Sequence, residues 1–434
     1  MKRFLALFIA AVLAVSVLTA CGSEAQKSQS EESQSQTVQD SSTISSQENQ
    51  KLSGKITVNT THSNLVDTVL KDLAQKFMDE NPGTEIVFQA IPDANQVLKI
   101  KMASSSLDDI TMVLPETKSS DFEKYFVPLD DLDFTKDNLY FYETGLGTDG
   151  KLYKIDGLIS YSGIAYNKKV FEECGITEVP KTWDDFYKVC EKIKAKGITP
   201  ISTSFKDGWP LQFWTDASFP FQNTGNANYF NELTDKDEIL SEDSGILAGL
   251  KALRSLNEKG FLDNDLMSAS WEGFRKDFPQ GKFAMTYTGS WYPPQFVEKG
   301  GDINDIGMFP VPGTKSLYIS SDWYYAIAAN TKNMDLAKAF MKWGFLDPKI
   351  MNAIGVASAI KGQKISDPCT AELMSYGLPV IEAVGLSDNY NTIKNKAQLD
   401  FIKMAQDYIV AKNPDEVVAK YNNAWANAKK AVAK

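Results

Sequence analysis

The residues best suited to chemistry in this chain are aromatic rings and carboxylates that fall in loops. Trp291 ends the stretch FPQGKFAMTYTGSW (residues 278–291), in which a turn at Gly281 leads into a short apolar strand over residues 283–287. A ring placed directly after a strand is accessible and is held rigidly by the strand beneath it. An indole offers a flat face to C–H groups, and carboxylates accept hydrogen bonds from hydroxyls. These residue types favour binding of an uncharged, hydroxyl-rich molecule.

Histidine chemistry is limited, because His62 is the only histidine in 434 residues. A single imidazole excludes zinc sites built from several histidines. His62 and Asn64 are expected in a loop between a strand and a helix, where a solvated imidazole and a ligand contact are both open alternatives. We expect no metal, no cofactor and no catalytic residue.

The N-terminal segment resembles a lipoprotein signal peptide over residues 1–20. Lys2 and Arg3 precede an apolar run from residue 4 to residue 18, which is too short to span a bilayer comfortably. Small residues before Cys21 resemble a bacterial lipobox, in which Cys21 becomes the lipidated first residue. No later apolar run reaches about 18 residues, so nothing else is expected to cross the membrane.

Residues 21–54 are expected to be a disordered tether behind the lipidated cysteine. Twenty of the thirty residues from 22 to 51 are Ser, Gln or Glu, and none is aromatic. Such a segment cannot bury enough apolar surface to offset its ordering entropy. A flexible chain of ~30 residues reaches about 30 Å, which would keep a tethered domain mobile above the bilayer.

Charge and cysteine content narrow the partners further. Without Lys2 and Arg3, 43 basic residues stand against 56 acidic ones, a net charge of −13. This balance argues against nucleic acid or anionic lipid as a partner. Three cysteines follow Cys21, an odd number that cannot all pair within one chain, and a disulfide between Cys174 and Cys190 stays open.

The folded part alternates between strand and helix patterns. Strand-like segments at 55–60, 84–90 and 107–114 are separated by segments with helical spacing of apolar residues. This alternation is typical of a parallel sheet covered by helices on both faces. Four later segments carry apolar stripes with helical spacing: 183–193, capped by Thr182; 246–256; 336–343; and 414–425, which begins at Pro414.

Four stretches, in the same order, resemble the extracellular solute-binding proteins of ABC importers, the carbohydrate-binding group that includes maltose-binding protein. They are KDLAQKFMDENPGTEIVFQAIPD (71–93), YSGIAYNKKVFEECGITEVPKTWDDF (161–186), FPQGKFAMTYTGSW (278–291) and AIAANTKNMDLAKAFMKW (326–343). The resemblance runs from about Lys55 to the C-terminus. It implies an α/β fold of two lobes, periplasmic-binding-protein-like (type II), with crossing segments as a hinge and a ligand cleft between the lobes.

The resemblance also implies boundaries and partners. Lobe 1 would comprise residues 55–162 plus 315–360, and lobe 2 residues 163–314 plus 361–434. The protein would be a monomeric, non-enzymatic receptor on the extracellular face of the cell membrane, held by its lipid anchor. It would deliver a neutral sugar, with an oligosaccharide favoured by the number of aromatic candidates, to permease subunits and their ATPase.

By resemblance, Trp291 stacks on sugar and Asp109 takes ligand hydroxyls. The family pattern before that aspartate has a proline where this chain has Asp108, which leaves open whether Asp108 or Asp109 faces the cleft. Tyr161 lies where the chain would cross between lobes. Asp322 replaces a glycine of the family pattern and is expected to tune specificity.

The other ligand candidates are wall residues from several loops: Trp323, Trp209, Trp271, Tyr390, His62 and Asn64. Trp183, Trp343 and Trp425 sit among apolar residues at helical spacing and are expected in cores. Gly281 and Gly289 are expected to serve tight turns with positive φ.

Two alternatives stay open. A secreted glycoside hydrolase would need two carboxylates roughly 5–10 Å apart across a bond, but the aromatic loops lack an obvious acid partner. The same fold could bind a non-sugar solute such as a polyamine or an anion. An anion would favour an arginine cluster, and only Arg254 and Arg275 follow Arg3.

Overall fold

The computed structural model describes residues 51–433 except 364, 366 and 383, and residues 51–434 form one compact unit. The expected signal peptide, Cys21 and the tether up to residue 50 lie outside the described residues. Within the described chain, none of the helices combines the length and the apolar character needed to cross a membrane.

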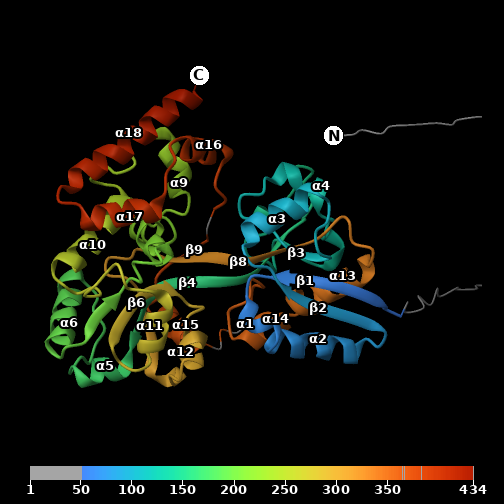
Figure 1. The fold of residues 1–434 in the computed structure, drawn as a ribbon, viewed down its shortest axis with the longest axis horizontal. Helices are drawn as coiled ribbons and strands as arrows, with labels where there is room; N and C mark the ends of the chain where they lie inside the picture. The colour runs from blue at the N-terminus through green and yellow to red at the C-terminus, as the bar shows by residue number, and fades with distance from the viewer. Residues whose placement is uncertain (1–50, 364, 366, 383, 434) are drawn as a thin grey trace, which may run out of the picture. The chain divides into compact units, whose positions relative to one another are not determined.

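Nine strands form one sheet in the order β2-β1-β3-β8-β4-β6-β5, with β7 paired to β4 and β9 paired to β8 (Figure 1). The strands are β1 (Gly54–Thr60), β2 (Thr84–Ala90), β3 (Ile110–Met112), β4 (Ile155–Asn167), β5 (Thr199–Ser202), β6 (Phe283–Gly289), β7 (Ile306–Phe309), β8 (Leu317–Ile327) and β9 (Val380–Glu382). β1 pairs in parallel with β2 and β3, as the alternating pattern predicts.

Two long strands connect the two lobes. The first half of β4, from Ile155 to Tyr161, pairs with β8, whereas the second half, from Ser162 to Asn167, pairs with β6 and β7. β8 in turn pairs with β3 at one end and β9 at the other. One continuous hydrogen-bonded ladder therefore passes from lobe 1 into lobe 2.

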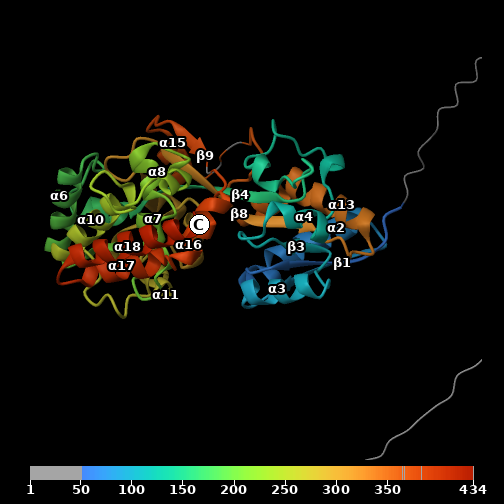
Figure 2. The same cartoon turned by 90° about the horizontal axis from the view of Figure 1, so that it is seen from above.

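Helices cover both lobes, and Figure 2 shows α2, α3 and α13 on one side of β4 and β8 and α6, α10 and α17 on the other. Around the β1–β3 sheet lie α1 (Ser63–Val66), α2 (Val69–Glu80), α3 (Ala94–Ala103), α4 (Phe122–Tyr125), α13 (Met334–Met341) and α14 (Lys349–Ile354). The second lobe holds α5 (Lys168–Glu173), α6 (Trp183–Ala195), α7 (Gln212–Thr215), α8 (Phe219–Thr224), α9 (Tyr229–Glu232), α10 (Gly245–Glu258), α11 (Trp271–Asp277), α12 (Pro293–Glu298), α15 (Pro368–Met374), α16 (Asp388–Lys396), α17 (Phe401–Val410) and α18 (Pro414–Val432).

Local signals in the sequence explain several helix boundaries. The Thr182 side chain accepts a hydrogen bond from the backbone N–H of Asp185 and so caps α6, as predicted. α18 begins at Pro414 as predicted, with Asn413 as its cap. Trp425 is fully buried, which confirms its place in a core, whereas Trp183 and Trp343 are half-buried and pack against the edges of the cores. The thiols of Cys174, Cys190 and Cys369 are all free.

Candidate functional site

The strands β4 and β8, which we call the crossing strands, present two chemically different faces. Asp156, Leu158 and Ser160 of β4 pair with Tyr324, Asp322 and Ser320 of β8, and paired residues in an antiparallel ladder share a face. We call this set of six residues the polar face. Because side chains alternate along a strand, Ile159 and Tyr161 point to the opposite face.

Three tryptophans gather on the second lobe beside the polar face. Trp209, Trp271 and Trp291 are each half-buried, with ring centroids 4.8 Å apart for Trp209 and Trp271, 5.9 Å for Trp209 and Trp291, and 5.8 Å for Trp271 and Trp291. They come from three separate places in the chain: a 3-10 helix at 209–211, the start of α11 and the segment after β6. Together they form an aromatic surface that water still reaches, and this is the tryptophan cluster referred to below.

Gly289 determines where the indole of Trp291 lies. A Cβ atom at Gly289 would stand 2.3 Å from Nε1 of Trp291 and 2.4 Å from Oγ of Ser160. The expectation of a positive φ holds for Gly281, at +77°, but is wrong for Gly289, which is absent from the positive-φ residues. Glycine is needed at position 289 because the indole of Trp291 and the hydroxyl of Ser160 lie too close to its backbone to leave room for a Cβ atom.

Ser160 contributes an unpaired hydroxyl at the same place. Its residue is 4% exposed, and its Oγ has no hydrogen-bond partner within the described chain. A buried hydroxyl without a partner is unfavourable by about 1–3 kcal/mol. Ser160 therefore has an unsatisfied hydrogen-bonding group next to the aromatic surface of Trp291.

His62, Asp322 and Trp323 form a second group at the end of β1. The imidazole of His62 stacks on the indole of Trp323 with centroids 4.6 Å apart. Trp323 has a φ of +60°, which is rare for a bulky residue, and its backbone N–H donates to Oδ1 of Asp322 at 2.7 Å. Trp323 is 2% exposed, so His62 and Asp322 present the open surface here. Asn64 is exposed in α1, so the expectation of a loop is wrong for this residue, whereas His62 directly precedes the helix.

The titration of His62 and Asp322 reflects a partly enclosed setting. Desolvation lowers the pKa of His62, and the charge of Asp322 opposes this in part. Desolvation raises the pKa of Asp322, opposed by the N–H of Trp323 and by His62. Yet the Asp322 residue is exposed to water. Asp322 is therefore a carboxylate that water reaches and that protein groups surround in part.

Asp108 and Asp109 both have intramolecular partners. Asp109 accepts hydrogen bonds from the backbone N–H of Thr57 at 2.8 Å and from the hydroxyl of Thr331 at 2.5 Å. Asp108 forms an ion pair with Lys101 and accepts from Asn59. Because these contacts hold β1, β3 and the segment after β8 together, we assign both carboxylates to the framework of lobe 1.

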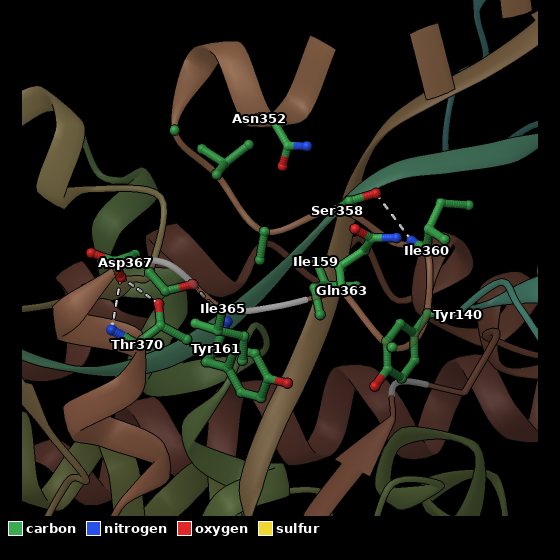
Figure 3. A pocket seen from close by; sticks show the side chains of 15 residues that line it. Tyr140, Ile159, Tyr161, Asn352, Ser358, Ile360, Gln363, Ile365, Asp367 and Thr370 are labelled. Atoms are coloured by element: carbon green, nitrogen blue, oxygen red, sulfur yellow. Dashed lines mark hydrogen bonds between the residues drawn. The ribbon is translucent and has the colours of Figure 1, made fainter. Parts of the chain in front are cut away.

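Tyr161 lies on the face of β4 opposite to Ser160. It lines a cavity of about 60 Å³ together with Tyr140, Ser290, Asn352 and Ser358, shown in Figure 3. Burial raises the pKa of Tyr161 to about 12. The tryptophan cluster does not line this cavity, although Ser290, the neighbour of Trp291, does. We base the site on the polar face, because the half-buried tryptophans, the unpaired hydroxyl of Ser160 and the exposed carboxylate of Asp322 are there.

Tyr390 lies in the core of lobe 2. It is 1% exposed and packs against Phe230 and Trp425 with ring centroids 5.7 Å and 5.9 Å away. Its ring is therefore not available to a ligand in this arrangement. The described residues contain no cluster of three or more His, Cys, Asp or Glu side chains suited to a metal ion.

Asp216 is the residue that reasoning from the sequence missed. It follows the loop GWPLQFWT, which is notable for its aromatic residues, and Ser218 links this loop to the hinge strand by a hydrogen bond of 2.7 Å to Ser162. Desolvation raises the pKa of Asp216 to about 6, against opposing effects of Lys394, Thr215 and Gln212. The signal in the sequence was a carboxylate next to an aromatic loop.

The raised pKa of Asp216 makes a stability prediction. Because the pKa of Asp216 is higher in the folded protein than in the unfolded one, the ionised carboxylate lowers the free energy of unfolding. This destabilisation is complete above about pH 6 and disappears as the pH falls towards 3.8. We expect Asp216→Asn to raise the free energy of unfolding by about 1–2 kcal/mol at pH 7.5, and by about a third as much at pH 4.5. Urea unfolding at both pH values measures this, with exposed Asp235→Asn as control. An equal effect at both pH values would contradict the assignment.

The close approach at Gly289 makes a second prediction. We expect Gly289→Ala to displace the indole of Trp291 and to destabilise the fold by about 1–3 kcal/mol, as overpacking does. Thermal unfolding and the tryptophan emission spectrum report the two effects. Gly385→Ala is the matched control, because a Cβ there meets nothing within 4 Å. Unchanged emission and stability in Gly289→Ala would show that the site is not so constrained.

Comparison with known proteins identifies relatives of this chain. The chain is 27% identical over 382 residues to the multiple sugar-binding protein of Streptococcus mutans, covering 84% of this chain and 88% of the relative. It is 23% identical over 299 residues to the arabinooligosaccharide-binding protein of Bacillus subtilis, covering 66% and 67%.

The fold itself also has counterparts among solved structures. A binding protein of an ABC transporter from Bifidobacterium animalis subsp. lactis, solved with mannobiose, superposes with a TM-score of 0.75 at 24% identity, covering 88% of this chain and 95% of that one. This likeness establishes the two-lobe α/β fold of periplasmic binding proteins. The family model described as bacterial extracellular solute-binding protein matches residues 62–348. With more than half of its length matched, the chain belongs to the bacterial extracellular solute-binding protein family.

Proposed function

We propose that this protein is the substrate-binding component of an ABC sugar importer and captures an uncharged oligosaccharide between its two lobes. The observation that carries the proposal is the half-buried tryptophan cluster beside the polar face of β4 and β8. The relatives support it, because the S. mutans and B. subtilis proteins are named for sugars and the B. animalis structure contains mannobiose. A solute-binding family argues against the glycoside hydrolase alternative.

The proposed ligand contacts divide by chemistry. Trp291, with Trp209 and Trp271 behind and beside it, provides a face for the C–H side of a sugar ring. Asp322 accepts hydroxyl hydrogens through its second oxygen, since Oδ1 already accepts from Trp323. Ser160 supplies a hydroxyl that lacks a protein partner in the described chain.

The proposed site keeps some of the residues predicted from the sequence and leaves others out. His62 stays in the proposed site as a neutral imidazole beside Asp322, and Asn64 stays at its edge. Trp323 acts beneath His62 as a support. Asp109 and Tyr390 are left out, because the carboxylate is engaged and the phenol is in a core. Tyr161 is left out because it faces the cavity on the other side of β4.

Capture would involve bending at the crossing strands. We keep the expected division into lobe 1 (55–162 and 315–360) and lobe 2 (163–314 and 361–434) as part of the proposal. A ligand that touches both lobes favours the closed arrangement by its differential affinity for the two states. The permease and its ATPase would then receive the sugar from the closed form of a monomeric receptor.

Removing the indole of Trp291 tests the proposed site. We expect Trp291→Ala to weaken the tightest-binding oligosaccharide at least about fivefold, because an aromatic contact is worth ~1 kcal/mol. Isothermal titration calorimetry with mannobiose, mannotriose, raffinose, arabinotriose and chitobiose identifies that ligand and measures the change.

Trp343→Ala is the matched control for this experiment. Trp343 is also half-buried, but it stacks on Phe340 and its Nε1 donates to Glu80 of α2. We expect this variant to lose stability and to keep the affinity of the unchanged protein. Unchanged affinity in a folded Trp291→Ala variant would contradict the site, and binding of no sugar in the panel would contradict the function.

We also propose that Cys21 carries a lipid that anchors the protein to the extracellular face of the membrane. The supporting observation is the lipobox-like sequence LTAC after a basic and then apolar segment. We expect radiolabelled palmitate to enter the protein in growing bacteria and Cys21→Ala to abolish labelling and membrane association. A labelled Cys21→Ala variant, or an unlabelled unchanged protein, would contradict the anchor.

A further inference from the structure

Two carboxylates beside the crossing strands have no cation within ion-pair distance in the described chain. Within the described chain, neither Asp216 nor Asp322 forms an ion pair with a lysine, an arginine or the histidine. Asp216 is half-buried and receives only long hydrogen bonds, 3.2 Å from the hydroxyl of Thr215 and 3.5 Å from the amide of Gln212. Asp322 receives one hydrogen bond, from the backbone of Trp323.

The two carboxylates lie beside the same face of β8. Asp322 and Tyr318 are four residues apart on β8 and so lie on one side of it, about 13 Å apart along the strand. Burial and the charge of Asp216 raise the pKa of Tyr318, while burial and the charge of Asp322 raise the pKa of Tyr324. The two tyrosines also influence each other. Ser218, two residues after Asp216, donates a hydrogen bond to Ser162 of β4, and Phe221 of α8 stacks on Tyr318 with ring centroids 4.2 Å apart. Asp216 therefore lies towards the Tyr318 end of this surface and Asp322 at the other end.

Several charged groups near this surface have other partners or stay beyond ion-pair distance. Lys154 is paired with Asp156 in the buried part of the polar face. Lys394 of α16 attracts Asp216 without reaching ion-pair distance, and Asp400 repels it. Arg254 and Arg275 are engaged with glutamates at other places in lobe 2. Within the described chain, no cation lies within ion-pair distance of either carboxylate, so neither negative charge is neutralised by direct pairing.

The region between the carboxylates also holds the unpaired hydroxyl of Ser160. Ser160 pairs with Ser320, midway between Tyr318 and Asp322 on β8, and its Oγ lies beside Gly289 with the indole of Trp291. A buried hydroxyl without a partner indicates a place where a ligand group or a water completes the hydrogen bonding. The carboxylates therefore flank a place that already lacks a hydrogen-bonding partner.

We propose, building on the proposed function, that Asp216 and Asp322 form a charge filter that admits uncharged oligosaccharides and rejects oligosaccharides that carry a carboxylate. Sugar hydroxyls donate to both carboxylates, which are stronger acceptors than neutral groups. A uronate at the same place would bring a like charge into a partly desolvated site in which no cation pairs directly with either carboxylate. Such repulsion against the wrong ligand is a recognised source of specificity.

Matched pairs of sugars test the filter. The tightest-binding neutral oligosaccharide of the panel is compared with the same sugar oxidised from the primary alcohol to the uronate at C6. We expect the uronate to bind the full-length protein about 100-fold more weakly at pH 7.5, the scale of a like-charge contact about 6 Å away at an effective dielectric constant of about 20. We expect the double variant Asp216→Asn, Asp322→Asn to reduce this difference to less than about tenfold.

Two controls distinguish the charge filter from a change in net charge and from a loss of folding. Asp235→Asn removes one negative charge from an exposed position of lobe 2 and should leave the discrimination unchanged. Urea unfolding confirms that each variant is folded before titration. If the uronate binds as tightly as the neutral sugar, or if the Asn variants keep the full discrimination, the filter is wrong while the proposed function stands. If no neutral sugar binds, both are wrong.

Discussion

The antiparallel pairing of β4 with β8 is the interaction on which the rest of the structure depends. This ladder passes from one lobe to the other, and the period of two along each strand gives it two different faces. Ser160 and Asp322 lie on the polar face, next to the tryptophan cluster. Tyr161 lies on the other face, in a small cavity. A shift of the register by one residue would exchange these faces and remove the site.

The site departs from what stability alone would favour. Trp323 holds a positive φ, Ser160 has an unpaired buried hydroxyl, and Asp216 is desolvated without an ion-pair partner in the described chain. Each feature is unfavourable by about 1–3 kcal/mol. Such features persist where the surrounding structure enforces them, and here they lie in or beside the surface of β4 and β8 that carries Ser160 and Asp322. Their concentration supports a binding role for that surface more strongly than any one of them does alone.

Local signals made part of the structure predictable from the sequence. The strand before Trp291, the cap at Thr182 and the start of α18 at Pro414 depend on neighbours within a few positions, and each was predicted correctly. The half-buried state of Trp291 agrees with the expectation of an accessible ring after a strand.

Long-range contacts made the rest unpredictable. Asp109 is held by Thr331, which lies 222 positions away, so its framework role could not be read from the loop around it. The face on which Tyr161 lies depends on which residues of β8 oppose β4. Asp216 joins the site through the fold of α7 and α8 against the crossing strands. The close packing that requires Gly289 involves a hydroxyl 129 positions earlier in the chain.

The most direct test of the account is a crystal structure of the full-length protein with its tightest-binding oligosaccharide. We expect a sugar ring lying flat against the indole of Trp291, with ring hydroxyls within hydrogen-bond distance of Asp322 and Ser160. A sugar bound in the cavity beside Tyr161, or anywhere remote from the tryptophan cluster, would contradict it.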